Sequence, residues 1–180
     1  YIFHHQLTLE AAYGGLLRRV RRTLHRRVAA ALERLYPDRI EEQLGILAHH
    51  WERAGDTVRA IDYLQRAGRR AAAQYANDEA LAYLDRALSS VPESDRQRRY
   101  DLLVERVTIY DRIGSRDAQQ ADLMRLQEIA EALDDGTAVG KRRLAQVKLY
   151  ETQLYEYTLD HEALAEAAQR AIRLARAAGD

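Results

Sequence analysis

The sequence predicts an all-α solenoid, in which antiparallel helix hairpins stack one after another. Its 180 residues include only 9 glycines and 2 prolines, which favours long helices over strands and turns. Apolar residues recur at helical spacing between turn signals, and the chain matches itself at a shift of 45 residues. With 47% hydrophobic and 31% charged residues, the chain is too apolar for a disordered protein and too charged for a membrane-spanning one.

Turn signals divide the chain into the expected helices. Asp56 is expected to cap a helix over residues 57–76, because its carboxylate can accept bonds from free backbone N–H groups. A shorter helix begins at Asn77 and ends before Pro92, since proline cannot continue a helix. Longer helices are expected over residues 95–113, 116–134, 138–158 and 161–178. The whole chain is expected to form eight or nine helices, and the short turns between them make neighbours antiparallel.

The internal match indicates repeated hairpins. At the 45-residue shift, Tyr110 falls on Tyr155 and Asp135 on Asp180. Residues 43–72 form a weaker third copy, in which Trp51 takes the bulky place of Tyr110. Stacked hairpins of this kind bury a continuous core and expose an extended concave surface.

Two segments carry a resemblance to the tetratricopeptide repeat family. The run LAHHWERAGDTVRAIDYLQRAGRRA, residues 47–71, has the small and bulky positions and the central Gly-Asp turn of one repeat. The segment NDEALAYLDRALSSVP, residues 77–92, matches the second-helix half of another. The resemblance implies a right-handed α-solenoid of divergent repeats, whose 45-residue shift is longer than the family's 34-residue period.

The N-terminal stretch, residues 1–37, does not fit a repeat. It resembles the segment that joins the nucleotidase module to the helical repeats in bacterial signalling ATPases of the STAND class. The resemblance implies that residues 1–40 are a helical arm from the end of a winged-helix-like region and that residues 41–180 are the repeats. It also implies a longer, cytoplasmic parent protein with a P-loop ATPase and a nucleotide cyclase domain or a transcription-regulating effector. This chain holds no GxxxxGK[ST] motif, so ATP binding is not expected within it.

The residues offer no catalytic constellation, and the chain is expected to be non-catalytic, with no cofactor and no metal. It contains no cysteine, which excludes thiolate chemistry and disulfides. No glycine-rich phosphate loop or nucleophilic serine elbow is present. His49 and His50 are adjacent, and adjacent helical residues point about 100° apart, whereas zinc on a helix favours ligands at i and i+4.

The sequence therefore predicts a protein-interaction or sensor module that binds a protein, a peptide, a small effector or a neighbouring domain in its groove. In tetratricopeptide repeats the first helix of each hairpin lines that groove. The expected groove residues are Glu42, His49, Arg53, Thr108, Arg112, Gln153 and Tyr157.

The alternative function is nucleic-acid binding through the arginine-rich helix at residues 18–27. Val20, Leu24, Val28 and Leu32 form an apolar stripe on this helix, so its arginines are expected on solvated or ion-paired faces. Nucleic acid is the less favoured partner because the formal net charge is zero, and no membrane contact is expected. The C-terminal helix, residues 161–178, is expected to support weak self-association through an uncapped apolar face.

Overall fold

The computed structural model describes residues 13–179, and within them it is all-α, as the sequence predicts. Residues 18–178 form eight α-helices and one 3-10 helix, and the described residues contain no strand. The elements are α2 (Arg18–Leu35), η1 (Pro37–Gln43), α3 (Leu44–Ala54), α4 (Thr57–Ala73), α5 (Asn77–Ser90), α6 (Arg96–Ile113), α7 (Arg116–Ala132), α8 (Ala138–Thr158) and α9 (His161–Ala178).

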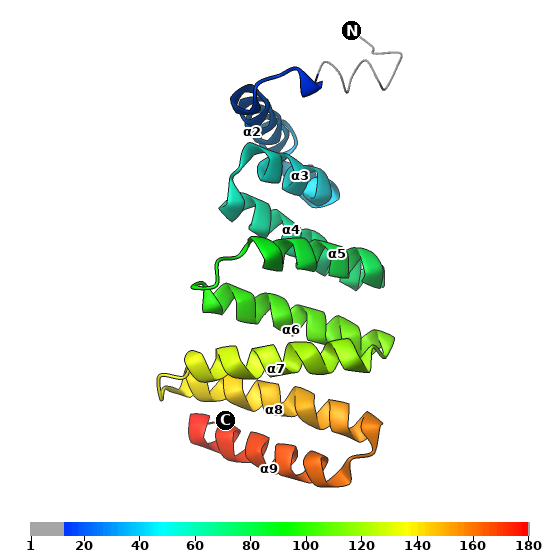
Figure 1. The fold of residues 1–180 in the computed structure, drawn as a ribbon, viewed down its shortest axis with the longest axis vertical. Helices are drawn as coiled ribbons and strands as arrows, with labels where there is room; N and C mark the ends of the chain where they lie inside the picture. The colour runs from blue at the N-terminus through cyan, green and yellow to red at the C-terminus, as the bar shows by residue number, and fades with distance from the viewer. Residues whose placement is uncertain (1–12, 180) are drawn as a thin grey trace.

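Consecutive helices lie side by side along one long axis, with α2 and α9 at opposite ends (Figure 1). Each helix runs antiparallel to the next because the links between helices are short. The turns α6–α7 and α8–α9 lie at one edge of the stack, and the turns α5–α6 and α7–α8 lie at the other (Figure 1). As a result α3, α5, α7 and α9 run in one direction, and α2, α4, α6 and α8 run in the other.

The helix boundaries agree with the sequence prediction to within three residues. Asp56 caps α4, as predicted, by accepting a bond from the backbone N–H of Arg59. Asp95 and Asp160 cap α6 and α9 in the same way. The predicted helix over residues 57–76 ends at Ala73, where the chain turns before α5 begins.

The three predicted hairpin copies share one kind of turn. The carbonyls of Trp51, Tyr110 and Tyr155 each accept a bond from the N–H five residues further on, which is the Schellman arrangement. The residue before that N–H is left-handed in every copy: Gly55, Gly114 and Leu159, with φ of 72°, 72° and 57°. Leu159 thus occupies, with a side chain, a conformation that favours glycine.

The core runs along the inside of the stack from α2 to α8. Trp51 is buried in α3, in the bulky position that the repeat pattern assigns to it. Helices α4 and α5 pack closely at Gly68, where a Cβ atom would lie 2.9 Å from Cγ of Leu84. Gly68 therefore permits an approach between the two helices that a larger residue would prevent.

The expected arm, residues 1–40, is described from residue 13 onward; residues 1–12 lie outside the described residues. Its described part, residues 13–40, contains α2 and the start of η1, and α2 packs antiparallel along α3. Arg22 donates from Nε to the carbonyl of Ala54 at 3.2 Å. The described part of the arm is thus the end helix of the stack.

Candidate functional site

A cleft of about 500 Å³ lies where α5, α6 and α7 meet. It forms because α5 ends early: Pro92 has no backbone N–H to donate, and Val91 before it is extended, with φ −79° and ψ 126°. The floor is apolar and consists of Leu88, Leu103 and Ile129. An adjoining hollow of about 690 Å³ continues along α5 toward Asp85.

The rim of the cleft is charged. Arg96 and Arg99 come from the first turn of α6, and Arg125 comes from α7; Glu93 and Glu128 line the cleft beside them. Three cations and two carboxylates leave an excess of one positive charge. The arrangement suits a chain segment that offers apolar side chains to the floor and a carboxylate to the arginines, because guanidinium groups bind carboxylates in a bidentate manner.

An ion cluster of Arg106, Asp122 and Asp85 lies beside the cleft, and Arg106 and Asp85 line the adjoining hollow. Nε of Arg106 lies 3.2 Å from Oδ2 of Asp122 on α7 and 3.3 Å from Oδ1 of Asp85 on α5. The Asp122 side chain is 2% exposed, and its burial raises its pKa against the opposing effect of Arg106 and Arg125. Arg106 also donates to the hydroxyl of Tyr110 at 3.0 Å. The cluster joins α5, α6 and α7 at one point.

The structure places the predicted groove residues of the first hairpin at the α2 end of the stack. Glu42 is exposed on η1 and bonds to Arg39 at 2.7 Å. His49 and Arg53 are exposed on α3, and the ring of His49 lies 5.7 Å from that of His25 on α2. His49 and Arg53 are one helical turn apart and share a face.

The predicted residues of the later hairpins lie on α6 and α8. Thr108 is exposed and bonds to the carbonyl of Val104 on its own helix. Arg112 donates to the carbonyl of Ala72 at 2.7 Å, at the α4–α5 turn. Gln153 and Tyr157 are exposed on α8.

The seven predicted residues lie on η1 and on helices that run in different directions. The helix α3 runs opposite to α6 and α8, because α4 and α5 both intervene before α6. Arg53 therefore lies near the opposite edge of the stack from Arg112 and Tyr157. None of the seven residues lines the cleft between α5, α6 and α7.

Three histidines meet where α2 packs against α3. Nδ1 of His25 lies 2.8 Å from Nδ1 of His50, and the Tyr13 hydroxyl lies 2.8 Å from Nε2 of His25. Burial lowers the pKa of His25, and the charges of His50 and His49 lower it further; burial likewise lowers the pKa of His50. Among the described residues, no group of three or more His, Asp or Glu side chains is placed to hold a metal ion.

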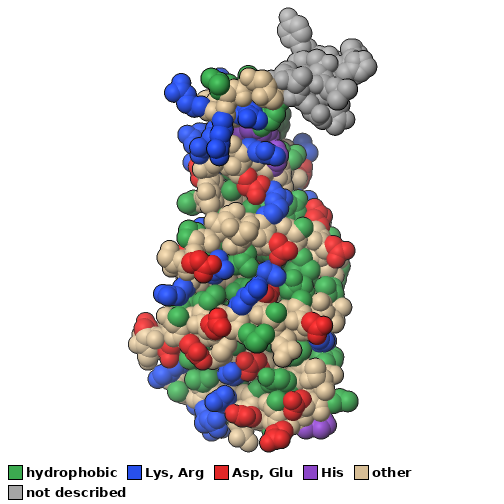
Figure 2. Space-filling view, viewed as in Figure 1, with side chains coloured by type: hydrophobic (Ala, Val, Ile, Leu, Met, Phe, Trp, Pro, Cys, Tyr) green, Lys and Arg blue, Asp and Glu red, His purple; other side chains and the backbone are tan. Residues whose placement is uncertain are grey.

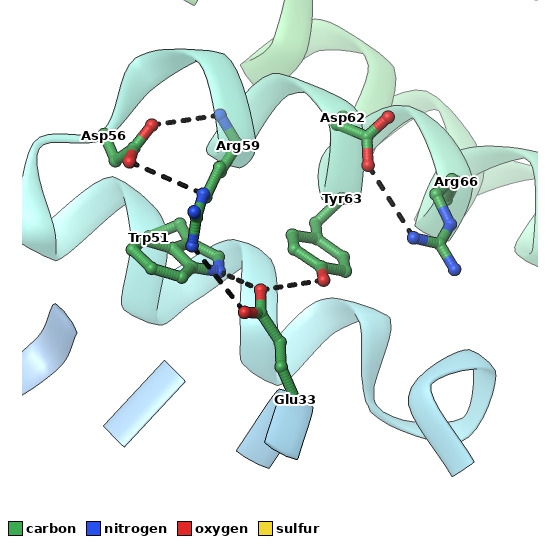
Figure 3. A network of polar contacts seen from close by, with 7 residues as sticks. All are labelled: Glu33, Trp51, Asp56, Arg59, Asp62, Tyr63 and Arg66. Carbon is green, nitrogen blue, oxygen red and sulfur yellow. Dashed lines mark hydrogen bonds and ion pairs between the residues drawn. The ribbon is translucent and has the colours of Figure 1, made fainter. Parts of the chain in front are cut away.

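A second polar network connects the C-terminal end of α2 to α3 and α4, the helices of the first hairpin (Figure 3). Oε1 of Glu33 accepts bonds from Nε1 of Trp51 at 2.9 Å and from the hydroxyl of Tyr63 at 2.8 Å. The guanidinium of Arg59 lies 4.3 Å from the Trp51 ring and 3.6 Å from Oε2 of Glu33. Burial and the bond to Glu33 raise the pKa of Tyr63 to about 12.

Sequence reasoning missed the cleft and its buried ion pair. One signal was present: Asp122 lies at helical spacing with Leu126 and Ala130, which are buried on α7. A carboxylate within an apolar stripe indicates a buried, partnered charge. Its partner, Arg106, lies on another helix, and no pattern in the sequence predicts that Arg106 pairs with Asp122.

Comparison with known proteins shows similarity to a bacterial protein but does not show a family. No protein-family model and no solved structure matches the chain. An alignment of 106 positions, which covers 57% of this chain, shows 34% identity to "Uncharacterized protein R02095" of Rhizobium meliloti (strain 1021). The alignment covers 10% of the relative, so the chain spans about a tenth of the length of that protein. Within the described residues, no helix is both long and apolar enough to cross a membrane.

Proposed function

We propose that this chain is a non-catalytic protein-interaction or sensor module of a multidomain, cytoplasmic bacterial signalling regulator. It is a right-handed solenoid of divergent tetratricopeptide-like hairpins, in a STAND-class ATPase linked to a nucleotide cyclase or a transcription-regulating domain. The antiparallel stack and the turn shared by three hairpins support the repeat character. The match to a much longer bacterial protein supports a multidomain parent.

The observation that carries the proposal is the cleft between α5, α6 and α7. An apolar floor beneath a charged rim is the pattern of a peptide site, in which apolar contacts give affinity and a few polar groups fix orientation. The partner that fits is a protein segment, or an effector of similar size, with apolar side chains next to a carboxylate. Arg96 and Arg125 are exposed on opposite walls, where they can reach that carboxylate.

A peptide array tests this function. We expect the chain to bind short peptides in which leucine or isoleucine adjoins aspartate or glutamate, and to bind their lysine counterparts more weakly. Arg125→Ala should weaken binding about tenfold, the loss typical of one charge-assisted bond. Arg98→Ala is the matched control, since Arg98 is on α6 but does not line the cleft. Equal affinity of both variants, or no binding peptide, would contradict the proposal.

The alternative function, nucleic-acid binding, rests on a different hollow. A cavity of about 530 Å³ is lined by Arg18, Arg19, Arg22 and Arg26 of α2, with Ala54 of α3. Four guanidinium groups around one cavity suit a phosphate. Titration with duplex and single-stranded DNA discriminates the two functions. Absence of binding at low salt eliminates the alternative, and a steep loss of affinity with salt supports it.

Self-association through α9 is also proposed. Ile172 is 52% exposed on this end helix, and an unpaired apolar face on an end helix favours contact with a copy of itself. Sedimentation at low and high concentration measures the contact. A strictly monomeric chain, unaffected by Ile172→Glu, contradicts it.

A further inference from the structure

The outer face of α2 carries an apolar stripe that nothing in the described chain covers. It consists of Leu17, at the start of the helix, and Val20, Leu24 and Val28, which are 75%, 40%, 43% and 42% exposed. Their spacing of three, four and four residues places them in one row. The sequence predicted this row with Leu32 as its fourth member, but Leu32 instead packs against the core.

The stripe is distinct from the face with which α2 contacts α3. Ala29 is fully buried and His25 is half-buried, and both face α3. At 100° per residue, the members of the stripe lie about 100–180° around the helix from Ala29. Each helix from α3 to α8 has a helix on both sides, whereas α2 packs against α3 and η1 among the described residues (Figure 1). The open stripe therefore lies on the side where the stack would continue with another helix.

The borders of the stripe are positively charged. The helical rotation places Arg21 on the border toward α3 and places Arg27 and Arg34 on the opposite border. The segment 18–27 contains no acidic residue, and Arg27 and Arg34 form no ion pair with any described residue. Arg and His side chains gather at this end of the molecule (Figure 2).

We propose that this stripe with its arginine borders is the docking site for an acidic amphipathic helix of a protein partner. The helix lays leucine, isoleucine or valine at i, i+3 or i+4 and i+7 along the stripe. Its glutamates and aspartates flank that row and meet Arg21 on one side and Arg27 and Arg34 on the other. The site is separate from the cleft between α5, α6 and α7, so neither proposal depends on the other.

The composition of α2 favours a helix over the other possible occupants. Helices that lie in membrane surfaces usually place tryptophan or phenylalanine beside leucine in the lipid, whereas α2 has no tryptophan, phenylalanine or tyrosine in Arg18–Leu35. Single-stranded nucleic acid needs aromatic rings on which its bases stack, and the α2 stripe offers none. The stripe is a row of branched apolar side chains that are each about half exposed. Such a row is typical of the surface along which one helix packs against another.

Two displayed helix libraries test the proposal with the whole 180-residue chain. Both carry Leu, Ile, Val or Ala in a row at helical spacing; the flanking positions are Asp or Glu in one library and Lys or Arg in the other. The affinity of selected peptides is measured by fluorescence anisotropy. The variants are Leu24→Ser with Val28→Ser, and separately Arg27→Glu. The matched control is Val58→Ser, which changes an exposed valine on α4.

We expect binders from the acidic library with micromolar affinity. The double serine variant should weaken them at least about tenfold, Arg27→Glu should weaken them too, and Val58→Ser should leave them unchanged. Circular dichroism checks that each variant keeps its helices; Arg27→Glu tests the site even if the double variant unfolds. The proposal is overturned if the acidic library yields no binder, or if its binders have the same affinity for both variants as for the unchanged chain. It is also overturned if only DNA, vesicles of phosphatidylcholine with phosphatidylglycerol, or a second copy of the chain binds through the stripe.

Discussion

Replacement of Glu33 by alanine should detach the end helix α2 from the first hairpin. The carboxylate accepts bonds from Trp51 and Tyr63, whose side chains belong to α3 and α4. Trp51 is 2% exposed and Tyr63 is 8% exposed, so water replaces the lost acceptor poorly at both donors. Glu33→Ala thus leaves two buried donors without a partner.

The expected loss of stability is about 3 kcal/mol, because each buried donor without a partner costs about 1–3 kcal/mol and Glu33 itself is partly solvated. The ion pair to Arg59 adds little, since its guanidinium is half exposed at 3.6 Å. Glu33→Gln keeps one acceptor oxygen and should lose about half as much. Glu41→Ala is the control: Glu41 forms an exposed ion pair with Arg66, and its loss should be below about 1 kcal/mol.

Fluorescence of Trp51 gives the assay, because it is the single tryptophan of the chain. In a stack, the stability of each helix depends on its neighbours. The midpoint of the fluorescence transition in urea should therefore move to a lower urea concentration, and the midpoint measured by far-ultraviolet circular dichroism should move less. Loss of Glu33 should also lower the pKa of Tyr63 from about 12, which tyrosinate absorbance measures. The reasoning is refuted if Glu33→Ala shifts the fluorescence midpoint no more than Glu41→Ala does.

Three further predictions concern other parts of the stack. Leu159→Gly should stabilise the chain by about 0.5 kcal/mol in urea unfolding, since relief of the left-handed conformation exceeds the added chain entropy; a loss would contradict this. The lowered pKa values of His25 and His50 mean that the folded chain binds fewer protons than the unfolded one near pH 6.5, so stability is full above that pH and is lost as pH falls through the folded values. The melting temperature should therefore fall on acidification, and His25→Asn should remove the part of the fall that His25 contributes and leave the part that His50 contributes. Arg106→Met should cost about 3 kcal/mol by leaving Asp122 without its main cation, and Arg106→Met with Asp122→Leu should recover most of this loss.

The sequence predicts the helices of this protein well because their ends depend on local chemistry. Asp56 caps α4 through its own side chain, and Pro92 ends α5 because it lacks a donor. Gly55 and Gly114 adopt the left-handed turn that the repeat pattern suggests. Each of these effects acts within a few residues. A single sequence therefore contains the information that is needed to predict where these helices begin and end.

The candidate site is less predictable because it depends on contacts between helices. Arg106 and Asp122 meet across α6 and α7, and no spacing rule relates their positions. The cleft exists because α5 is four residues shorter than α6, which leaves Leu88 and Leu103 beneath a gap. A sequence pattern can predict both helices, but it does not give the positions of their ends relative to each other in space.

The direction of a helix in the stack illustrates this limit. The turn after Trp51 aligns without a gap with the turn after Tyr110, with Arg and Gly at the same places, and the structure gives both the same backbone bond. Local similarity nevertheless does not place the two hairpins in the same orientation. Two helices, α4 and α5, separate α3 from α6, and each additional antiparallel helix reverses the chain. The C-terminal ends of α3 and α6 therefore lie at opposite edges of the stack, so a groove must be assigned by counting helices as well as by matching repeats.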